Sequence, residues 1–92
     1  MQSEVRDGVL YVKGEVTVKT VTPANYARFE QQCRLNETHT VDLSEVSRAD
    51  SSCVSLLLTA LRLKPSSVAL RGLPDSVAAL AELYEIKEWV AP

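Results

Sequence analysis

Apolar and polar residues alternate in the first part of the chain, in the stretch "GVLYVKGEV". Leu10 and Val12 fall on one side of this stretch and Lys13 falls on the other, which is the period-two pattern of a strand. Segment 3–6 is a candidate partner strand for a hairpin. The β-branched stretch 16–21 also predicts extended backbone.

The pattern then changes to a helical spacing. Thr22 is a suitable N-cap and Pro23 is tolerated in a first turn, so a helix is predicted to begin there and to end near Asn36. Its apolar residues recur at intervals of three and four and therefore share one face. They are Tyr26, Phe29 and Cys33.

Two short apolar runs, "HTVDLS" and "SVALRG", predict a central strand around Val41 and a further strand around Leu70. Between them "DSSCVSLLLTALRL" predicts a helix that Asp50 caps and Pro65 ends. A last helix is predicted to open at Pro74 and Asp75. Its apolar stripe consists of Val77, Leu80, Ala81 and Tyr84, and Trp89 is expected to pack back onto the body.

Strands and helices therefore alternate along the chain, which favours parallel strands joined by right-handed crossovers. The predicted fold is α/β, with a mixed, mostly parallel central sheet of about four to five strands and helices packed on it. Apolar residues make up 46% of the 92 residues, which is enough for a packed core. With no linker or repeat, residues 1–92 are expected to form a single domain.

Composition narrows the classes of function. The net charge is −2 and basic residues form no run, so nucleic acid is not an expected partner. No apolar run exceeds five residues, far short of a bilayer span, which predicts no direct membrane insertion. The polar N-terminus lacks the pattern of a signal peptide, so a cytoplasmic location is expected. Cys33, Cys53 and His39 show no metal-ligand spacing, so we expect no metal and no cofactor, and two reduced, mostly buried thiols.

The helix after Asp50 is unusually apolar. At 100° per residue its apolar side chains cover roughly 220° of the circumference, whereas docking on a sheet needs about 100°. Either neighbouring elements cover the surplus or another protein does. These residues are Cys53, Val54, Leu56, Leu57, Leu58, Ala60, Leu61 and Leu63.

The remaining arc of this helix is dominated by small hydroxyl residues. Small side chains let another backbone approach, and hydroxyl groups can satisfy its polar groups, although these residues can equally face water. We expect a partner-binding surface here, centred on Ser51, Ser52, Ser55 and Thr59 and flanked by Leu56 and Leu58. The first turn also suits an anion, which makes Ser51 a possible phosphorylation site.

Catalytic motifs are missing from the sequence. Its three glycines are scattered, and neither a phosphate-binding loop nor a nucleophile elbow occurs. His39 precedes the central strand and Ser51 follows it, so the two are expected at opposite edges of the sheet. Asp50 is better explained as a helix cap. The sequence predicts no catalytic residues and favours a binding module over an enzyme.

The segment "VDLSEVSRADSSCVSLLL" resembles the signature of STAS domains, in which Asp-Leu-Ser-x-Val ends a strand and Asp-Ser-Ser-Gly opens a helix. Asp42, Leu43, Ser44 and Val46 match the first part, and residues 50–52 match the second. The likeness is strongest to the MlaB family, the small STAS subunits of Mla phospholipid transporters. That family has the run Asp-Leu-Ser-x-Val-Ser-Arg-x-Asp, which this chain matches over residues 42–50.

The resemblance to MlaB proteins implies an accessory subunit, not an enzyme. Such subunits bind the cytosolic ATPase (MlaF) of an inner-membrane ABC complex that also contains permease and substrate-binding subunits. The complex maintains the lipid asymmetry of the outer membrane, so this chain would be cytoplasmic and peripheral to the inner membrane. The hydroxyl residue after the signature Asp, here Ser51, is important for that contact.

The wider STAS resemblance implies an alternative. In anti-sigma factor antagonists the position of Ser51 is the regulatory phosphorylation site. Cys53 stands where the STAS family usually has Gly. A Cβ there is expected to narrow the approach to the helix start, which counts against the phosphorylation switch.

Overall fold

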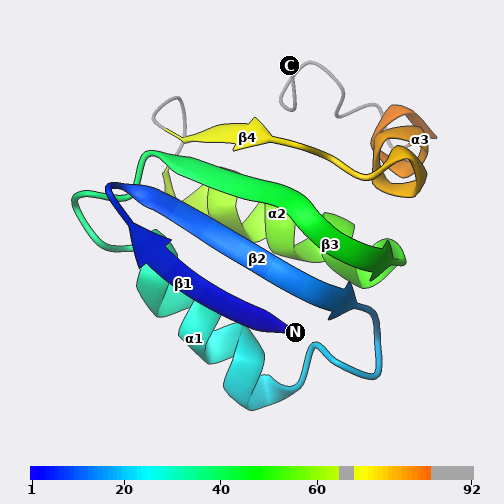
Figure 1. The fold of residues 1–92 in the computed structure, drawn as a ribbon, viewed down its shortest axis with the longest axis horizontal. Helices are drawn as coiled ribbons and strands as arrows, with labels where there is room; N and C mark the ends of the chain where they lie inside the picture. Colours follow the sequence, from blue (N-terminus) through cyan, green and yellow to red (C-terminus); the bar gives the residue numbers. More distant parts are fainter. Residues whose placement is uncertain (65–67, 84–92) are drawn as a thin grey trace.

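The computed structural model describes residues 1–64 and 68–83. A four-stranded sheet has the order β1-β2-β3-β4, and helices cover one of its faces (Figure 1). Strand β1 is antiparallel to β2, while β2–β3 and β3–β4 are parallel, so the predicted mixed, mostly parallel sheet is confirmed. The elements are β1 (Gln2–Arg6), β2 (Val9–Val16), α1 (Pro23–Cys33), β3 (Thr40–Ala49), α2 (Ser51–Leu63), β4 (Ala69–Arg71) and α3 (Asp75–Leu83).

The predicted hairpin joins β1 to β2. Asp7 and Gly8 form its two-residue turn with φ of 51° and 79°, the left-handed pair that suits the twist of the strands. Leu10 and Val12, the apolar positions of the alternating pattern, are fully buried. The hairpin therefore follows directly from the sequence pattern.

The prediction of extended backbone over 16–21 is wrong. Strand β2 ends at Val16, and the chain turns instead. The Thr20 amide donates to the Thr17 carbonyl at 3.0 Å, and the Thr20 hydroxyl donates to the Glu15 carbonyl at 2.8 Å. Threonine hydroxyl groups offer the backbone local partners, and here those bonds outweigh the β-propensity of the side chains.

Helix α1 begins as predicted, because the Thr22 side chain accepts a hydrogen bond from the Asn25 amide at 3.2 Å and Pro23 occupies the first turn. It ends at Cys33, three residues before the predicted end at Asn36. The Thr38 hydroxyl donates to the Gln32 carbonyl at 2.8 Å, so a residue that follows the helix supplies a hydrogen-bond donor to a carbonyl of its last turn.

Strand β3 is longer than the motif suggested. It runs for ten residues to Ala49 beside the eight-residue β2, and two register shifts absorb the difference. Extra residues of this kind bend a strand and increase its twist. Because β3 remains paired up to its last residue, the start of α2 lies next to the end of β2.

Helix α2 lies between α1 and α3 and contacts both. The core forms where this helix layer meets the sheet, and Phe29, Leu43 and Leu57 are among its largest side chains. The predicted strand around Leu70 and the last helix are present, and Val77 is fully buried. The side chains of Leu80 and Ala81, and Pro65, Tyr84 and Trp89 as a whole, lie outside the described residues.

The helices α1, α2 and α3 are short. Within residues 1–64 and 68–83, none has the length and hydropathy that crossing a bilayer requires.

Candidate protein-binding surface

Asp50 stands at the end of β3 and binds two segments of the chain. Its Oδ1 accepts a hydrogen bond from the Ser52 amide at 2.8 Å, which confirms Asp50 as the N-cap of α2. Its Oδ2 accepts from the Val18 amide at 3.0 Å. The same carboxylate therefore caps α2 and holds the loop that follows β2.

These two hydrogen bonds set the protonation of Asp50. The bond from the Val18 amide, followed by that from the Ser52 amide, lowers the pKa of the Asp50 carboxyl below its ordinary value. The carboxylate is thus charged at neutral pH, and its charge is directed at backbone N–H groups.

The predicted hydroxyl surface divides into two parts. Ser51 and Ser55 are exposed and Ser52 is half-buried, so these three can meet a partner. Thr59 is only 3% exposed. Its hydroxyl lies 2.8 Å from the Tyr26 hydroxyl on α1 and donates to the Ser55 carbonyl at 3.0 Å. The prediction that Thr59 belongs to the accessible surface is wrong, because its hydroxyl joins α2 to α1.

The two leucines predicted to flank the surface also differ. Leu56 is 1% exposed and belongs to the core, so its assignment to the accessible surface is wrong. Leu58 is 37% exposed. The exposed residues of α2 follow one another at helical spacing, and we refer to them as the α2 stripe: Ser51, Ser55, Leu58 and Arg62.

Most of the surplus apolar arc is covered within this chain. Helix α2 is the middle helix of the layer, so side chains that would not reach the sheet meet α1 or α3 instead. Of the two explanations for the surplus, contact with neighbouring helices accounts for all of it except Leu58 and the partly buried Leu61 and Leu63.

Cys53 is fully buried and faces the core. The expectation that its side chain narrows the approach to the helix start is therefore wrong, because the accessible side of this turn is the side of Ser51. Burial, with a smaller contribution from the negative charge of Asp50, raises the pKa of the Cys53 thiol to about 12. Burial likewise raises the pKa of the Cys33 thiol to about 12, so neither sulfur is an activated nucleophile.

A shallow hollow of about 330 Å³ lies beside the start of α2. Val18 projects at its edge with 74% of its surface exposed. The only sign of this loop in the sequence is one apolar residue inside the polar run "TVKT", which the predicted binding surface did not include. The lining residues are Glu15, Thr17, Val18, Lys19, Arg48, Ala49 and Asp50.

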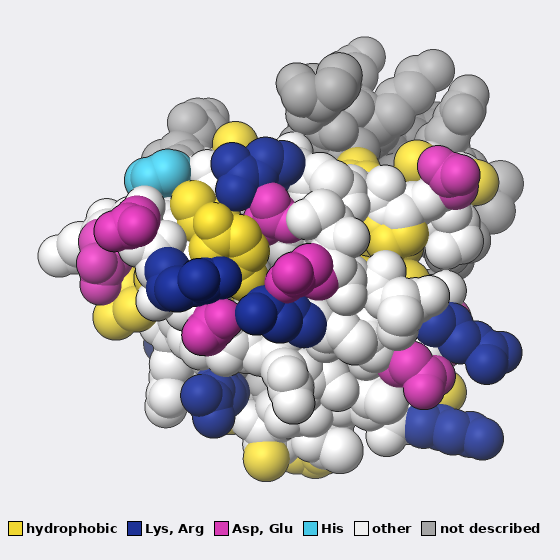
Figure 2. All heavy atoms as spheres, viewed as in Figure 1, with side chains coloured by type: hydrophobic (Ala, Val, Ile, Leu, Met, Phe, Trp, Pro, Cys, Tyr) yellow, Lys and Arg dark blue, Asp and Glu magenta, His cyan; other side chains and the backbone are white. Residues whose placement is uncertain are grey.

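The face of the sheet that the helices do not cover carries charged side chains of both signs (Figure 2). Asp42, which belongs to the sequence motif, is held there by Arg71 at 2.6 Å and by the Ser44 hydroxyl at 2.6 Å. Burial alone would raise the pKa of Asp42, but the hydrogen bonds from Ser44 and the charge of Arg71 outweigh it and lower the pKa. Lys13 likewise pairs with Glu4 at 2.9 Å and with Glu45 at 3.5 Å, so charges on this face pair with one another within the chain.

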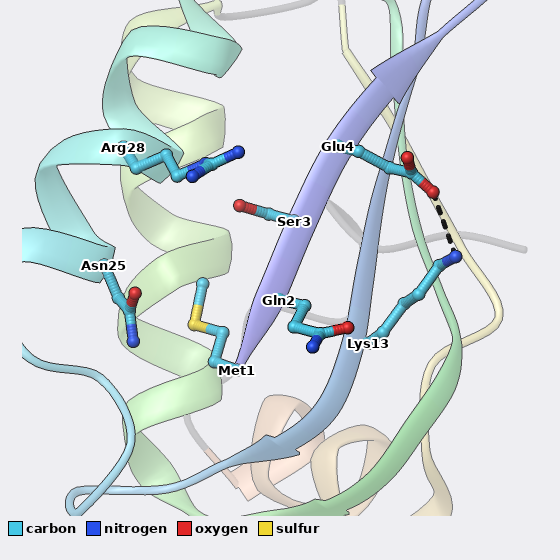
Figure 3. A pocket seen from close by; sticks show the side chains of 7 residues that line it. All are labelled: Met1, Gln2, Ser3, Glu4, Lys13, Asn25 and Arg28. Atoms are coloured by element: carbon cyan, nitrogen blue, oxygen red, sulfur yellow. Dashed lines mark hydrogen bonds and ion pairs between the residues drawn. The ribbon is translucent and has the colours of Figure 1, made fainter.

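A second hollow, of about 320 Å³, surrounds the start of edge strand β1 (Figure 3). Ser3 points toward Arg28 and Asn25 of α1, whereas Glu4 lies on the other side of the strand, hydrogen-bonded to Lys13 at 2.9 Å. Its lining therefore comes from both sides of an edge strand. His39 lies elsewhere, before the start of β3, and Ser51 follows the end of β3, so the two stand at opposite ends of that strand.

A mixed four-stranded sheet whose middle strand leads directly into a capped helix is the architecture of a STAS domain. The solved structure of "the Anti-Sigma Factor Antagonist SpoIIAA in its Unphosphorylated Form" has a similar fold, with a TM-score of 0.59 and 21% sequence identity. The likeness covers 89% of this chain and 81% of that chain. At this identity the likeness establishes the fold.

The family model described as "Mlab, STAS domain" matches residues 1–91. The chain therefore belongs to the MlaB-type family of STAS domains. No curated protein matches the chain.

Proposed function

We propose that this chain is a non-catalytic accessory subunit that binds the ATPase of a phospholipid ABC transporter through the α2 stripe. The observation that carries the proposal is the accessibility of Ser51, Ser55 and Leu58 on a helix whose opposite side is buried in its own chain. The MlaB-type family match supports the choice of partner.

The α2 stripe has the properties of a protein-binding surface. Ser51 and Ser55 are small, so another backbone can approach α2 closely at that point. Among the described residues the Ser51 hydroxyl has no hydrogen-bond partner, and it is free to bond to a partner. Leu58 lies two turns further on and supplies apolar area that is lost from water on binding.

The proposal assigns the chemistry to the partner. The ATPase subunit hydrolyses ATP, while this chain supports its assembly within a complex of permease and substrate-binding subunits. In that complex the chain lies on the cytoplasmic side of the inner membrane and contributes to outer-membrane lipid asymmetry.

Substitutions at Ser51 test the proposal. Ser51→Ala removes one hydrogen bond and is expected to weaken binding to the purified ATPase subunit about fivefold. Ser51→Glu places an unpaired charge in the interface and is expected to weaken binding at least about 100-fold. Ser76→Glu is the matched control, since Ser76 is also exposed in the first turn of a helix, α3. Equal binding by all four proteins, measured by calorimetry, would refute the assignment of the surface.

A second candidate function is that of an anti-sigma factor antagonist regulated by phosphorylation of Ser51. The observation in its favour is that Ser51 is exposed in the first turn of α2, where the positive end of the helix dipole favours a phosphate. Intact mass after incubation with cytosolic extract and ATP separates the two candidates. A gain of one phosphate that Ser51→Ala abolishes favours the switch, and an unchanged mass favours the transporter subunit.

A further inference from the structure

Val18 is the most exposed large hydrophobic residue among those that the structure describes, with 74% of its surface accessible. Leu35 and Leu58 follow at 42% and 37%. A single exposed apolar residue is common on a protein surface and needs no explanation by itself. Val18 differs because of the loop that carries it.

The loop of Val18 is held in one conformation by its own hydrogen bonds. The Thr17 amide donates to the Thr20 hydroxyl at 2.9 Å, and the Val21 amide donates to the Thr17 carbonyl at 2.9 Å. The Asn25 side-chain amide of α1 donates to the Thr20 carbonyl at 2.7 Å. A loop fixed in this way presents Val18 without the entropy cost that ordering a flexible loop on binding would add.

The loop is also fixed to the α2 stripe. Oδ2 of Asp50 accepts from the Val18 amide, while Oδ1 accepts from the Ser52 amide, directly after Ser51. The apolar tip of the loop and the first turn of α2 therefore form one rigid surface, although 32 residues separate Val18 from Asp50 in the sequence.

We infer that Val18 is a second, apolar contact for the partner that binds the α2 stripe, and that Asp50 is the positioning residue that sets Val18 beside Ser51. This inference rests on the proposed function, because the occupant is the same ATPase subunit. Its predicted counterpart on that subunit is an apolar cavity of about the volume of a valine side chain.

The charges beside Val18 specify the rim of that cavity. Lys19, Arg48 and Glu15 line the adjacent hollow and are exposed, and none forms an ion pair with any residue that the structure describes, so two free cations outnumber one free carboxylate there. The carboxylate of Asp50 is directed at backbone amides. The exposed cations therefore fit a partner that carries Asp or Glu next to the apolar cavity, since opposite charges steer and orient such contacts.

Removal of the Val18 side chain tests the contact. Val18→Ala takes away two methyl groups and is expected to weaken binding to the purified ATPase subunit about tenfold, as measured by calorimetry. Leu35→Ala is the matched control, because Leu35 is also exposed but lies before the start of β3, at the other end of the sheet from Asp50. Its affinity is expected to equal that of the unmodified chain.

The positioning role of Asp50 needs a separate readout. Asp50→Asn keeps one side-chain oxygen to cap α2 but loses the second acceptor, so the Val18 amide is released. In the Asp50→Asn background, Val18→Ala is expected to change the affinity less than threefold instead of tenfold. An undiminished effect of Val18→Ala in that background would show that Val18 acts without Asp50 and would overturn the positioning role.

The same titrations distinguish failure of this inference from failure of the proposed function. Suppose that Ser51→Glu abolishes binding while Val18→Ala and Leu35→Ala both bind like the unmodified chain. Binding through the α2 stripe is then supported and the contact at Val18 is refuted. If the unmodified chain does not bind the ATPase subunit, the proposed function and the contact at Val18 are both refuted. A selective loss at Val18, absent at Leu35, supports the contact.

Discussion

The two faces of α2 are built from the same run of sequence and have opposite roles. Leu57 is fully buried and the next residue, Leu58, is 37% exposed. The Thr59 hydroxyl is hydrogen-bonded with the Tyr26 hydroxyl, while Ser55, one turn earlier, remains exposed. The buried face holds the helix layer together, and the exposed face is left for a partner. Whether a leucine or a hydroxyl residue of α2 contributes to stability or is available for binding therefore depends on its position around the helix and not on its residue type.

The same comparison applies to the two aspartates of the motif that runs along β3. Asp42 pairs with Arg71 and Ser44 on the outer face of the sheet, and its role is within the fold. Asp50, at the far end of the strand, joins the start of α2 to the loop of Val18. One motif thus contributes a structural carboxylate and a carboxylate that organises the candidate interface.

The largest effect is expected from the pair of adjacent leucines. Leu57→Ala opens a cavity in the core and is expected to lower the free energy of unfolding by about 2–5 kcal/mol. Leu58→Ala is expected to lower it by less than about 1 kcal/mol, because Leu58 is partly exposed, yet to weaken binding to the ATPase subunit. Urea titration measures the first quantity and calorimetry the second. Equal destabilisation by the two variants would contradict the assignment of Leu57 to the core and Leu58 to the exposed face.

A smaller effect is expected from the two hydroxyl residues one turn apart. Thr59→Val keeps the shape but leaves the partly buried Tyr26 hydroxyl without its partner, which costs about 1 kcal/mol of stability. Ser55→Ala is expected to change stability by less than about 0.5 kcal/mol and to reduce affinity instead. Chemical denaturation of both variants checks this. A destabilising Ser55→Ala with a neutral Thr59→Val would reverse the assignment of the two faces.

The acid response of the chain gives the smallest expected effect. The pKa values of Asp42 and Asp50 are both lowered in the folded state, so their contribution to stability is present above their ordinary pKa. It is lost as the pH falls through the lowered values, so the melting temperature should decline below about pH 4. Asp50→Asn should make that decline shallower. A slope identical to that of the unmodified chain would contradict the stabilising role of the two hydrogen bonds that the Asp50 carboxylate accepts.

The sequence was sufficient for the elements that depend on local patterns. The alternation around Leu10, the capping residues Thr22 and Asp50, and the motif at the end of the central strand predicted the hairpin, two helix starts and the family. The sequence was not sufficient where contacts between distant elements decide which side chains are buried. Leu56 and Thr59 fell outside the accessible surface because α2 is the middle helix of its layer, which periodicity alone does not reveal.

The loop after β2 shows the same limit. Its β-branched residues predicted a strand, but the hydroxyl groups of the loop and a carboxylate 32 residues away from Val18 fix it as a turn. A hydrogen bond over that separation leaves no signal in a single sequence. The contact between Val18 and Asp50, which organises the candidate surface, could therefore be found only in the structure.

The central claim is that a partner covers the exposed face of α2, and site-specific photo-cross-linking tests it most directly. A photoreactive amino acid in place of Ser55 is expected to cross-link this chain to the transporter ATPase subunit in cells. The same amino acid in place of Glu45, exposed on β3 and paired with Lys13, is expected to give no such product. Cross-linking from position 45 but not from position 55 would contradict the account.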